Sequence, residues 1–551
     1  MRMGLLAKIC ILAMCGLGLS PSVSPASAMT LGVATHFAQG WPIGLLRNAQ
    51  DLGTRAIRDD ISWQQGEPSL GHYDPAHLVP AYLRDACRKG FDVLLVIDPR
   101  RPDYEGGKMV ASADGQAAFA RYAAALLDRV PARCVSGLEV GNEINSNADM
   151  MGADEAKTIE AYARLLHVLR DAIHAKHPDV AIVGGSTNMI GTGFLTKLMD
   201  AGAFDAMDAV AVHPYRSIPE NVDLELARLT ETMRRHGVLR PIWVTEFGDY
   251  FPRAELAPPH LIKMAMLLAA AGVDRAYWYA LQDEPWFANM GLYDKAGARK
   301  PSADAFALTQ RDLLRGGAPK RVDQGDRRSF VFQLASGGYV LWGDSRPIRF
   351  DRFISATDSR GAAVERPDML TEDPVVLPAG TAFSLGQSAI VADSLLDYGD
   401  AAWSYGAQKP GDRPIALAMR DSRWTSSYFD PALDPLTIGA SSLTPAGEGN
   451  APTAAVVRYT APYAQNLLVS ACFAKKVGGD GVAVHVSVDD KPVFDTVVTE
   501  RSTIDRLAVA LPARGRLAFA FSAAGRWGNE DVSYRIRLTT PSGAVAPACI
   551  R

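Results

Sequence analysis

Two stretches of the 551-residue chain decide the fold: Val135-Ser136-Gly137-Leu138-Glu139-Val140-Gly141-Asn142-Glu143 and Pro241-Ile242-Trp243-Val244-Thr245-Glu246-Phe247-Gly248. In each, an apolar run typical of a buried parallel strand leads into a glutamate, Glu143 or Glu246. In a (β/α)8 barrel, catalytic groups collect at the carboxyl ends of the strands. Hydrolysis of a glycosidic bond requires two carboxylates at one cleft. The pairing therefore predicts a carbohydrate-cleaving enzyme.

Short β-like runs alternate with amphipathic helical stretches from residue 31 to about residue 314. The eight candidate strands are Leu31–His36, Arg55–Asp59, Asp92–Asp98, Val135–Gly141, Val180–Gly184, Asp208–His213, Pro241–Glu246 and Asp274–Leu281. The clearest helical stretches are Pro75–Lys89, Asp114–Arg129, Ala153–Lys176, Leu224–His236 and Pro259–Ala271. This order predicts an α/β fold with a (β/α)8 barrel over residues 29–315. The doubly wound alternative lacks a glycine-rich phosphate loop after its first strand.

After a linker at Arg315-Gly316-Gly317-Ala318-Pro319, helical periodicity gives way to short strands separated by turns. We expect a small β-domain over residues 320–390 and a jelly-roll-like β-sandwich over residues 391–551. The sandwich is a candidate carbohydrate-binding module. Its tryptophans, Trp403, Trp424 and Trp527, could contact sugar, but we favour core positions for them.

The first 28 residues read as a secretory signal peptide, with Arg2 and Lys8 before an apolar stretch and Ala26-Ser27-Ala28 at its end. Export to the periplasm or the medium is the expectation. Lipidation at Cys15 is disfavoured because Met14 is bulky. The formal net charge is −4 and basic runs are lacking, which argues against nucleic acid or an anionic membrane as the main partner. We find no later segment apolar and long enough to span a bilayer.

Four cysteines follow the predicted signal peptide: Cys87, Cys134, Cys472 and Cys549. Export makes disulfides permissible. Pairing within the barrel region and within the C-terminal region is the simplest of three connectivities, and four buried thiols are the alternative.

The chain resembles clan A glycoside hydrolases, most closely family 39 and the bacterial exopolysaccharide glycosidases grouped there. The likeness covers residues 30 to 315, and more weakly the region to residue 390. It rests on Gly141-Asn142-Glu143, Thr245-Glu246-Phe247-Gly248, Val212-His213-Pro214-Tyr215, Tyr277-Trp278-Tyr279, and Gly291-Leu292-Tyr293-Asp294 before Lys300-Pro301. The resemblance implies a retaining mechanism with Glu143 as acid/base and Glu246 as nucleophile. An acid needs a raised pKa, whereas a nucleophile must stay ionised.

The resemblance also implies substrate-binding residues around these glutamates. Arg58 is similar to the arginine that supports the nucleophile, although a pair with Asp59 or Asp60 is the alternative. Asn142 would bind the sugar 2-hydroxyl and Tyr215 the nucleophile, with His213 lining the cleft or serving only structure. Trp278 is the expected floor of the cleavage subsite. Further subsite candidates are Trp63 and Trp286, each with core packing as its alternative, and His36; we assign Trp243 to the core.

We therefore expect an exported retaining glycosidase, endo-acting on a polysaccharide or oligosaccharide such as a bacterial exopolysaccharide. An exo-acting β-xylosidase-like or arabinosidase-like enzyme and a non-catalytic carbohydrate-binding protein are the alternatives. No metal is expected, because the histidines lack HExxH spacing and no Cys/His cluster occurs. No Gly-x-Ser-x-Gly elbow follows a strand, and the chemistry needs no cofactor. The sugar, the linkage and the oligomeric state are left open.

Overall fold

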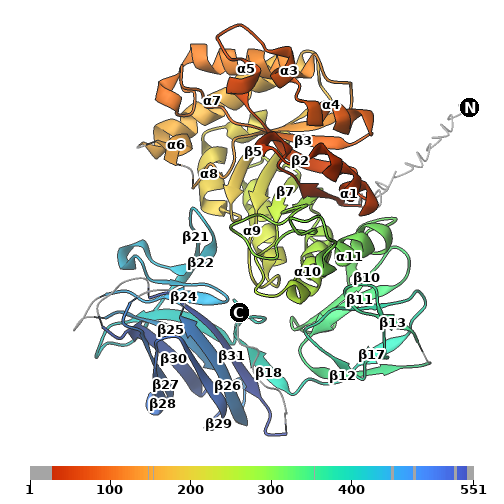
Figure 1. Cartoon of the computed structure of the whole chain (residues 1–551). Helices are drawn as coiled ribbons and strands as arrows, with labels where there is room; N and C mark the ends of the chain where they lie inside the picture. Colours follow the sequence, from red (N-terminus) through yellow and green to blue (C-terminus); the bar gives the residue numbers. More distant parts are fainter. Residues whose placement is uncertain are drawn as a thin grey trace, which may run out of the picture.

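The computed structural model describes residues 28–146, 148–152, 154–352, 354–447, 452–475, 479–525 and 530–542. Its N-terminal part is a closed barrel of parallel strands in sequential order, with helices outside (Figure 1). Pairing of the first strand with the eighth closes the barrel, with Val33 opposite Trp278. The strands are β1 (Thr30–Ala34), β2 (Ala56–Ile61), β3 (Asp92–Ile97), β4 (Val135–Val140), β5 (Ala181–Asn188), β6 (Ala209–His213), β7 (Ile242–Phe247) and β8 (Arg275–Trp278).

Amphipathic helices cover the barrel with their apolar faces. The helices are α1 (Leu46–Asp51), α2 (Trp63–Gly66), α3 (Pro75–Leu78), α4 (Ala81–Arg88), α5 (Ala113–Leu127), α6 (Ala148–Met151), α7 (Glu155–His174), α8 (Thr192–Asp200), α9 (Val222–Arg235), α10 (Ala257–Ala270) and α11 (Pro301–Leu308). Short helices are η1 (Phe37–Gln39), η2 (Ile43–Leu45), η3 (Glu105–Gly107), η4 (Ala203–Ala206), η5 (Ala254–Leu256), η6 (Thr309–Leu313) and η7 (Pro431–Leu433). Across the part of the chain described here, we find no helix that combines the length and apolar character of a membrane span.

Three sequence predictions about element boundaries were wrong. The strand expected over Val180–Gly184 continues to Asn188, as β5. The expected helix over Pro75–Lys89 is two helices, α3 and α4, because Pro80 lacks an amide hydrogen and disfavours helical geometry at the residue before it. The expected strand over Asp274–Leu281 ends at Trp278, where the chain leaves the barrel wall. This early end decides which aromatic residue faces the cavity.

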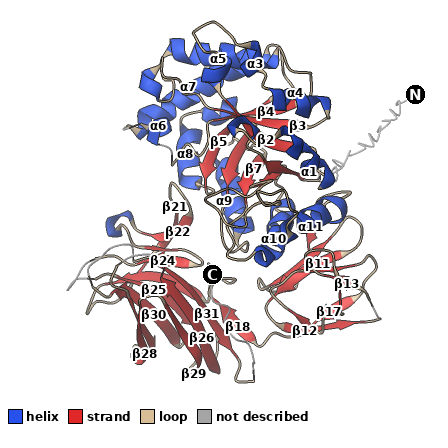
Figure 2. Cartoon of the chain, in the orientation of Figure 1, coloured by secondary structure: helices blue, strands red, loops and turns tan. Residues whose placement is uncertain are grey.

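Two β-rich regions follow the barrel (Figure 2). Sheets of six and three strands contain β9 (Lys320–Arg321), β10 (Ser329–Gln333), β11 (Tyr339–Gly343), β12 (Arg346–Phe350), β13 (Ala356–Thr357), β14 (Ala363–Val364), β15 (Met369–Leu370), β16 (Val375–Leu377) and β17 (Phe383–Leu385). The C-terminal sandwich contains β18 (Ile390–Asp393), β19 (Trp403–Gln408), β20 (Ile415–Ala416), β21 (Ala418–Asp421), β22 (Ser426–Phe429), β23 (Thr437–Ile438), β24 (Ser442–Thr444), β25 (Ala454–Thr460), β26 (Gln465–Lys475), β27 (Val482–Val488), β28 (Lys491–Val498), β29 (Arg501–Leu511), β30 (Arg516–Ala523) and β31 (Val532–Thr539). The predicted barrel followed by β-domains is thus confirmed.

The sandwich has its own hydrophobic core between an eight-stranded and a six-stranded sheet. Phe473 of β26 and Phe519 of β30 are fully buried there, from opposite sheets. Trp403 is buried in the same core, as expected. The predicted Trp527 lies outside the described residues.

Buried charges join the three regions. Arg535 of β31 donates to Asp393 of the sandwich at 2.8 Å and lies 3.0 Å from Glu372 of the small β-domain. On the barrel, the carboxylate of Glu220 accepts from the Trp342 indole at 2.9 Å. The charged groups of Arg535, Asp393 and Glu220 are buried. A buried charge is stable only if it keeps its partners. These contacts fix how the β-domains lie against the barrel.

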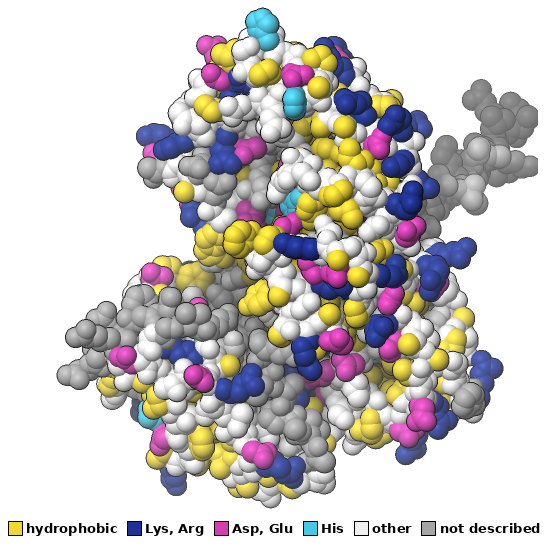
Figure 3. All heavy atoms as spheres, in the orientation of Figure 1, with side chains coloured by type: hydrophobic (Ala, Val, Ile, Leu, Met, Phe, Trp, Pro, Cys, Tyr) yellow, Lys and Arg dark blue, Asp and Glu magenta, His cyan; other side chains and the backbone are white. Residues whose placement is uncertain are grey.

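The carboxyl ends of the barrel strands surround a cavity of about 990 Å³. Its walls come from the loops after β1, β2, β3, β4, β5, β6, β7 and β8. In the space-filling view, acidic and histidine side chains are visible beside a hollow in the middle of the barrel (Figure 3). Side chains from distant parts of the sequence therefore meet in one place.

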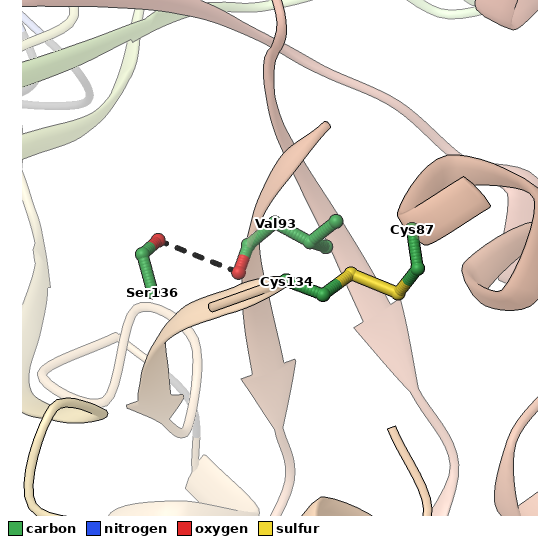
Figure 4. The surroundings of a disulfide bond; sticks show 4 residues. All are labelled: Cys87, Val93, Cys134 and Ser136. Carbon is green, nitrogen blue, oxygen red and sulfur yellow. Dashed lines mark hydrogen bonds between the residues drawn. A yellow bond between two sulfur atoms is a disulfide. The ribbon is translucent and has the colours of Figure 1, made fainter. Parts of the chain in front are cut away.

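A disulfide joins Cys87 at the end of α4 to Cys134 just before β4 (Figure 4). It confirms the predicted pairing within the barrel region. Cys472 of β26 is also disulfide-bonded; its predicted partner Cys549 lies outside the described residues. Both bridges disfavour the alternative of four free thiols.

We expect Cys134→Ala to destabilise the barrel. The bridge closes a loop across 47 residues of separation, and removing it lets the unfolded chain explore more conformations. The free energy of unfolding should fall by about 3 kcal/mol in urea titrations. Cys87→Ala should give the same loss, and the double variant no more than either. Additive losses would show that the thiols act separately.

Candidate active site

Glu143 and Glu246 enter the cavity from opposite sides of the barrel. Glu246 lies in β7, whereas Glu143 follows β4. The turn carrying Glu143 is unusual, because Gly141 (φ 78°) and Glu143 (φ 47°) both have left-handed backbone angles. A residue other than glycine rarely adopts this conformation, and such positions cluster at functional sites.

The two carboxylates are close together. An oxygen of Glu143, an oxygen of Glu246 and a ring nitrogen of His213 all lie within 4.8 Å of one another. The Nδ1 atom of His213 is 3.4 Å from Glu143 Oε1 and 3.6 Å from Glu246 Oε2. Two carboxylates this close are nearer than the roughly 6.5–9.5 Å of a pair that activates a water, and the spacing suits direct attack by one of them.

Arg58 of β2 is the central cation of the site. Its guanidinium donates to Glu246 Oε1 at 2.5 Å, to Glu139 Oε2 at 2.6 Å and to Asn142 Oδ1 at 2.7 Å. Burial alone would lower the pKa of Arg58, but Glu139 and Glu246 raise it well above its ordinary value. The alternative of a rim pair with Asp59 or Asp60 therefore does not describe this side chain.

Tyr215 and Asn142 both lie at the cavity, where the resemblance put them. The Tyr215 hydroxyl donates to Glu246 Oε2 at 2.5 Å. Because Asn142 Oδ1 accepts from Arg58, its amide nitrogen is directed elsewhere and can donate to a ligand. Both oxygens of Glu246 thus accept hydrogen bonds, one from a guanidinium and one from a phenol hydroxyl.

Glu143 has different surroundings from Glu246, but the expectation of a raised pKa was wrong. Burial raises its pKa, yet His213 and the hydrogen bond from Asn188 bring the pKa below its ordinary value. Asn188 Nδ2 donates to Glu143 Oε1 at 2.8 Å. A raised pKa would require the neighbouring positive charge to be lost or displaced.

His213 is fully buried beneath the two carboxylates, so the prediction that it lines the cleft was wrong. The Thr245 hydroxyl donates to Glu139 at 2.8 Å and can therefore only accept from His213 Nε2, 2.9 Å away. The other ring nitrogen of His213, Nδ1, faces carboxylate oxygens of Glu143 and Glu246. Both nitrogens accordingly carry hydrogen, as in an imidazolium ion.

The pKa of His213 agrees with this arrangement. Burial alone would lower the pKa, but the charge of Glu246 and hydrogen bonds with Glu139 and Glu143 raise it to about 9. Arg58 and His213 likewise hold the pKa of the buried Glu139 well below its usual range. At the floor of the cavity, the cations Arg58 and His213 therefore lie among the carboxylates of Glu139, Glu143 and Glu246.

Two of the predicted aromatic platforms were wrong. Trp278 is fully buried, stacked against Phe251, with its indole donating to the Met290 carbonyl. Trp63 borders the cavity but is buried and packed between Tyr104 and Tyr122. Neither ring offers a free face. Trp286 is 84% exposed, beside the cavity-lining Phe287.

Tyr279 lies at the cavity instead of Trp278. Its hydroxyl is 3.0 Å from His36 Nε2, and its ring is edge-on to Tyr215. His36 also borders the cavity, where it remains a predicted substrate-binding residue. Sequence reasoning missed Tyr279 because the register at the end of β8 decides which of two adjacent aromatics turns inward.

Glu139 and Asn188 were also missed. Glu139 is fully buried and binds Arg58, Ser186 and Thr245. A charge inside the apolar run of β4 was the available signal, because buried glutamates are rare unless paired. Asn188, at the end of β5, carried no comparable signal.

The cluster of Glu143, His213 and Glu246 also has the spacing of a metal site. A protonated imidazole cannot ligate a metal, and Glu246 is already engaged by Arg58 and Tyr215. The donor set therefore fits an ion-pair network better than a cation site.

Residues 140–305 match the family model of the glycosyl hydrolase catalytic core. A family 39 glycoside hydrolase from Bacteroides cellulosilyticus WH2 is similar in structure, with a TM-score of 0.53 and 20% identity over 64% of this chain and 81% of that chain. A family 39 β-xylosidase from Caulobacter crescentus gives a TM-score of 0.45 and 16% identity over 64% and 97% of the two chains. No curated protein matches. The predicted relation to glycoside hydrolases is confirmed by the family model, and the barrel fold by the first structure.

We expect His213 to make stability depend on pH in the alkaline range. Its folded pKa of about 9 exceeds the ordinary value of 6.5, so the stabilisation is fully present below pH 6.5 and is lost as pH rises through 9. Urea unfolding of the wild type should show this loss. His213→Gln should be less stable at pH 6 and should approach the wild type by pH 10. Parallel curves for the two proteins would contradict a protonated His213.

Proposed function

We propose that this glycosyl hydrolase core cleaves a polysaccharide or oligosaccharide with retention of configuration, using Glu246 as nucleophile and Glu143 as acid/base. The observation that carries the proposal is the close approach of two carboxylates in unequal surroundings. Retaining enzymes have carboxyl groups about 5–5.5 Å apart, and inverting enzymes about 6.5–9.5 Å. Oxygens within 4.8 Å of each other support retention.

Glu246 suits the nucleophile because both of its oxygens accept hydrogen bonds, from Arg58 and from Tyr215. One carboxylate oxygen attacks the anomeric carbon, and the bond to the leaving oxygen breaks with its electron pair. Glu143 gives that oxygen a proton. Glu143 then takes a proton from water, whose oxygen displaces Glu246 and regenerates the enzyme.

The proton for the first step is shared between Glu143 and His213. The raised pKa of His213, about 9, favours the proton on its imidazole, whose Nδ1 lies 3.4 Å from Glu143 Oε1. A bound sugar would exclude water from Glu143, and desolvation raises the pKa of a carboxyl group. Substrate binding therefore favours transfer of the proton to the carboxylate that must act as acid.

The cavity supports a substrate longer than one sugar. Its volume of about 990 Å³ lies at the upper end of the range for ligand sites, and its lining continues past the glutamates to Arg100 and Pro102 after β3. We propose endo action on this basis. Tyr279, His36 and Asn142 would hold the sugar at the cleavage point.

We also propose that the protein is exported. Residues 1–28 have the pattern of a signal peptide, and the Cys87–Cys134 bridge is typical of an oxidising compartment. Fractionation of producing cells should find the chain in the periplasm or medium, and recovery only from the cytoplasm would contradict export.

Glu246→Gln should abolish turnover, because the amide keeps the shape but cannot attack the anomeric carbon. A panel of bacterial and plant polysaccharides, with product masses measured, identifies the substrate of the wild type. A 2-fluoro sugar of that specificity should label Glu246 in peptide mass spectra. Glu255→Gln, at an exposed glutamate outside the cavity lining, is the control variant and should keep turnover. Label on another residue, or an active Glu246→Gln, would contradict the assignment.

Glu143→Ala should lose more activity on natural substrates than on glycosides with an activated leaving group, which need little protonation. General acid catalysis contributes about 10²–10⁴-fold, which sets the expected difference. Azide should restore the rate by occupying the vacated space and attacking the glycosyl-enzyme. Equal losses on both substrates and no azide rescue would exclude Glu143 as the acid/base.

A further inference from the structure

A hairpin of the C-terminal sandwich reaches the carboxyl end of the barrel. Strands β21 and β22 form the hairpin, and its tip, residues 422–425, lies against the loop between β5 and α8 (Figure 1). The tip carries Trp424, which is 40% exposed. The sequence interpretation of Trp424 as a core residue was therefore wrong.

The tip is fastened to the barrel through its backbone. The Gly191 amide donates to the Trp424 carbonyl at 2.8 Å, and the Gly193 amide donates to the Ser422 carbonyl at 3.0 Å. At the base of the tip, Arg228 of α9 donates to Asp421 Oδ2 at 3.0 Å. These contacts hold the tip at one place on the barrel.

The two glycines allow this close approach. A Cβ atom at Gly193 would lie 2.4 Å from the Asp421 carbonyl oxygen, and one at Gly191 would lie 2.9 Å from that of Arg423. No other residue type fits at Gly193 without moving the hairpin. Glycines at positions 191 and 193 of the barrel thus allow the backbone of the tip to pack directly against the barrel backbone.

A short chain of hydrogen bonds connects the tip to Glu143. Asn145 Nδ2 donates to the Arg423 carbonyl at 2.9 Å, and Asn145 Oδ1 accepts from the backbone N–H of Asn188 at 2.8 Å. Asn188 in turn donates its side-chain amide to Glu143 Oε1 at 2.8 Å. The tip therefore lies on the side of the site where Glu143 lies.

We propose that Trp424 is a sugar-binding platform beyond the cavity, on the leaving-group side of the cleavage point, so that the C-terminal sandwich extends the substrate-binding surface of the barrel. The inference rests on the proposed function, since the residue that protonates the leaving group lies on the side from which that group departs. Indole rings stack on the apolar faces of sugars. Backbone anchoring of the tip lowers the entropy lost when the ring binds.

Two substrates distinguish sugar binding by Trp424 from a general effect of its substitution on catalysis or folding. A glycosyl fluoride has no leaving-group sugar and reports the chemistry alone, whereas the polysaccharide occupies both sides of the cleavage point. Both substrates share the sugar and anomeric configuration identified with the wild type. The variants are Trp424→Ala, Trp424→Phe and, as control, Tyr463→Ala, which removes another exposed aromatic ring from the sandwich.

For Trp424→Ala, kcat/KM on the polysaccharide should fall on the order of tenfold, as expected when one aromatic face is lost. Its kcat/KM on the glycosyl fluoride should be unchanged. Trp424→Phe should recover most of the activity, and Tyr463→Ala should match the wild type on both substrates.

Equal losses of Trp424→Ala on both substrates, or no loss on either, would overturn the proposal. A wild type that cleaves no polysaccharide of the panel would instead contradict the proposed function, and the platform with it.

Discussion

The buried guanidinium of Arg58 is the contact on which the site depends. It joins Glu139 of β4, Glu246 of β7 and Asn142 of the loop after β4. A charge removed from water is stable only with its partners in place, and breaking such a set costs several kcal/mol. The barrel brings these distant residues together, and their mutual requirement fixes the end of β4 against β2 and β7. The positions of Glu246 and of Asn142, which precedes Glu143 in the chain, follow from that constraint.

The same network makes the two glutamates chemically unequal. Glu246 accepts hydrogen bonds from Arg58 and Tyr215, which hold both of its oxygens in place. Glu143 instead lies beside the His213 imidazolium and the Asn188 amide. Glu139 holds His213 through Thr245. One additional buried carboxylate thus contacts Arg58 directly and His213 through Thr245, while Glu143 and Glu246 remain at the cavity.

The barrel and its two glutamates could be predicted because they depend on local patterns: apolar strands, helical periodicity and the residue at each strand end. Other features depended on contacts that a linear pattern does not contain. The choice between Trp278 and Tyr279 follows from where β8 ends, and the ionised state of Glu143 from the proton held by His213. The docking of Trp424 joins parts of the chain more than two hundred residues apart. The role of Glu139 could be predicted only in part. The sequence shows a charged residue within an apolar strand, but it does not show which residues that charge contacts.

The stereochemistry of the first-formed product tests the central claim most directly. If Glu246 attacks the sugar, two successive inversions at the anomeric carbon give net retention. Proton NMR, recorded before the released sugar equilibrates between anomers, distinguishes the two configurations. The account predicts that the first product has the anomeric configuration of the bond that was cleaved. A product of opposite configuration would mean that water attacks directly and would contradict the role given to Glu246.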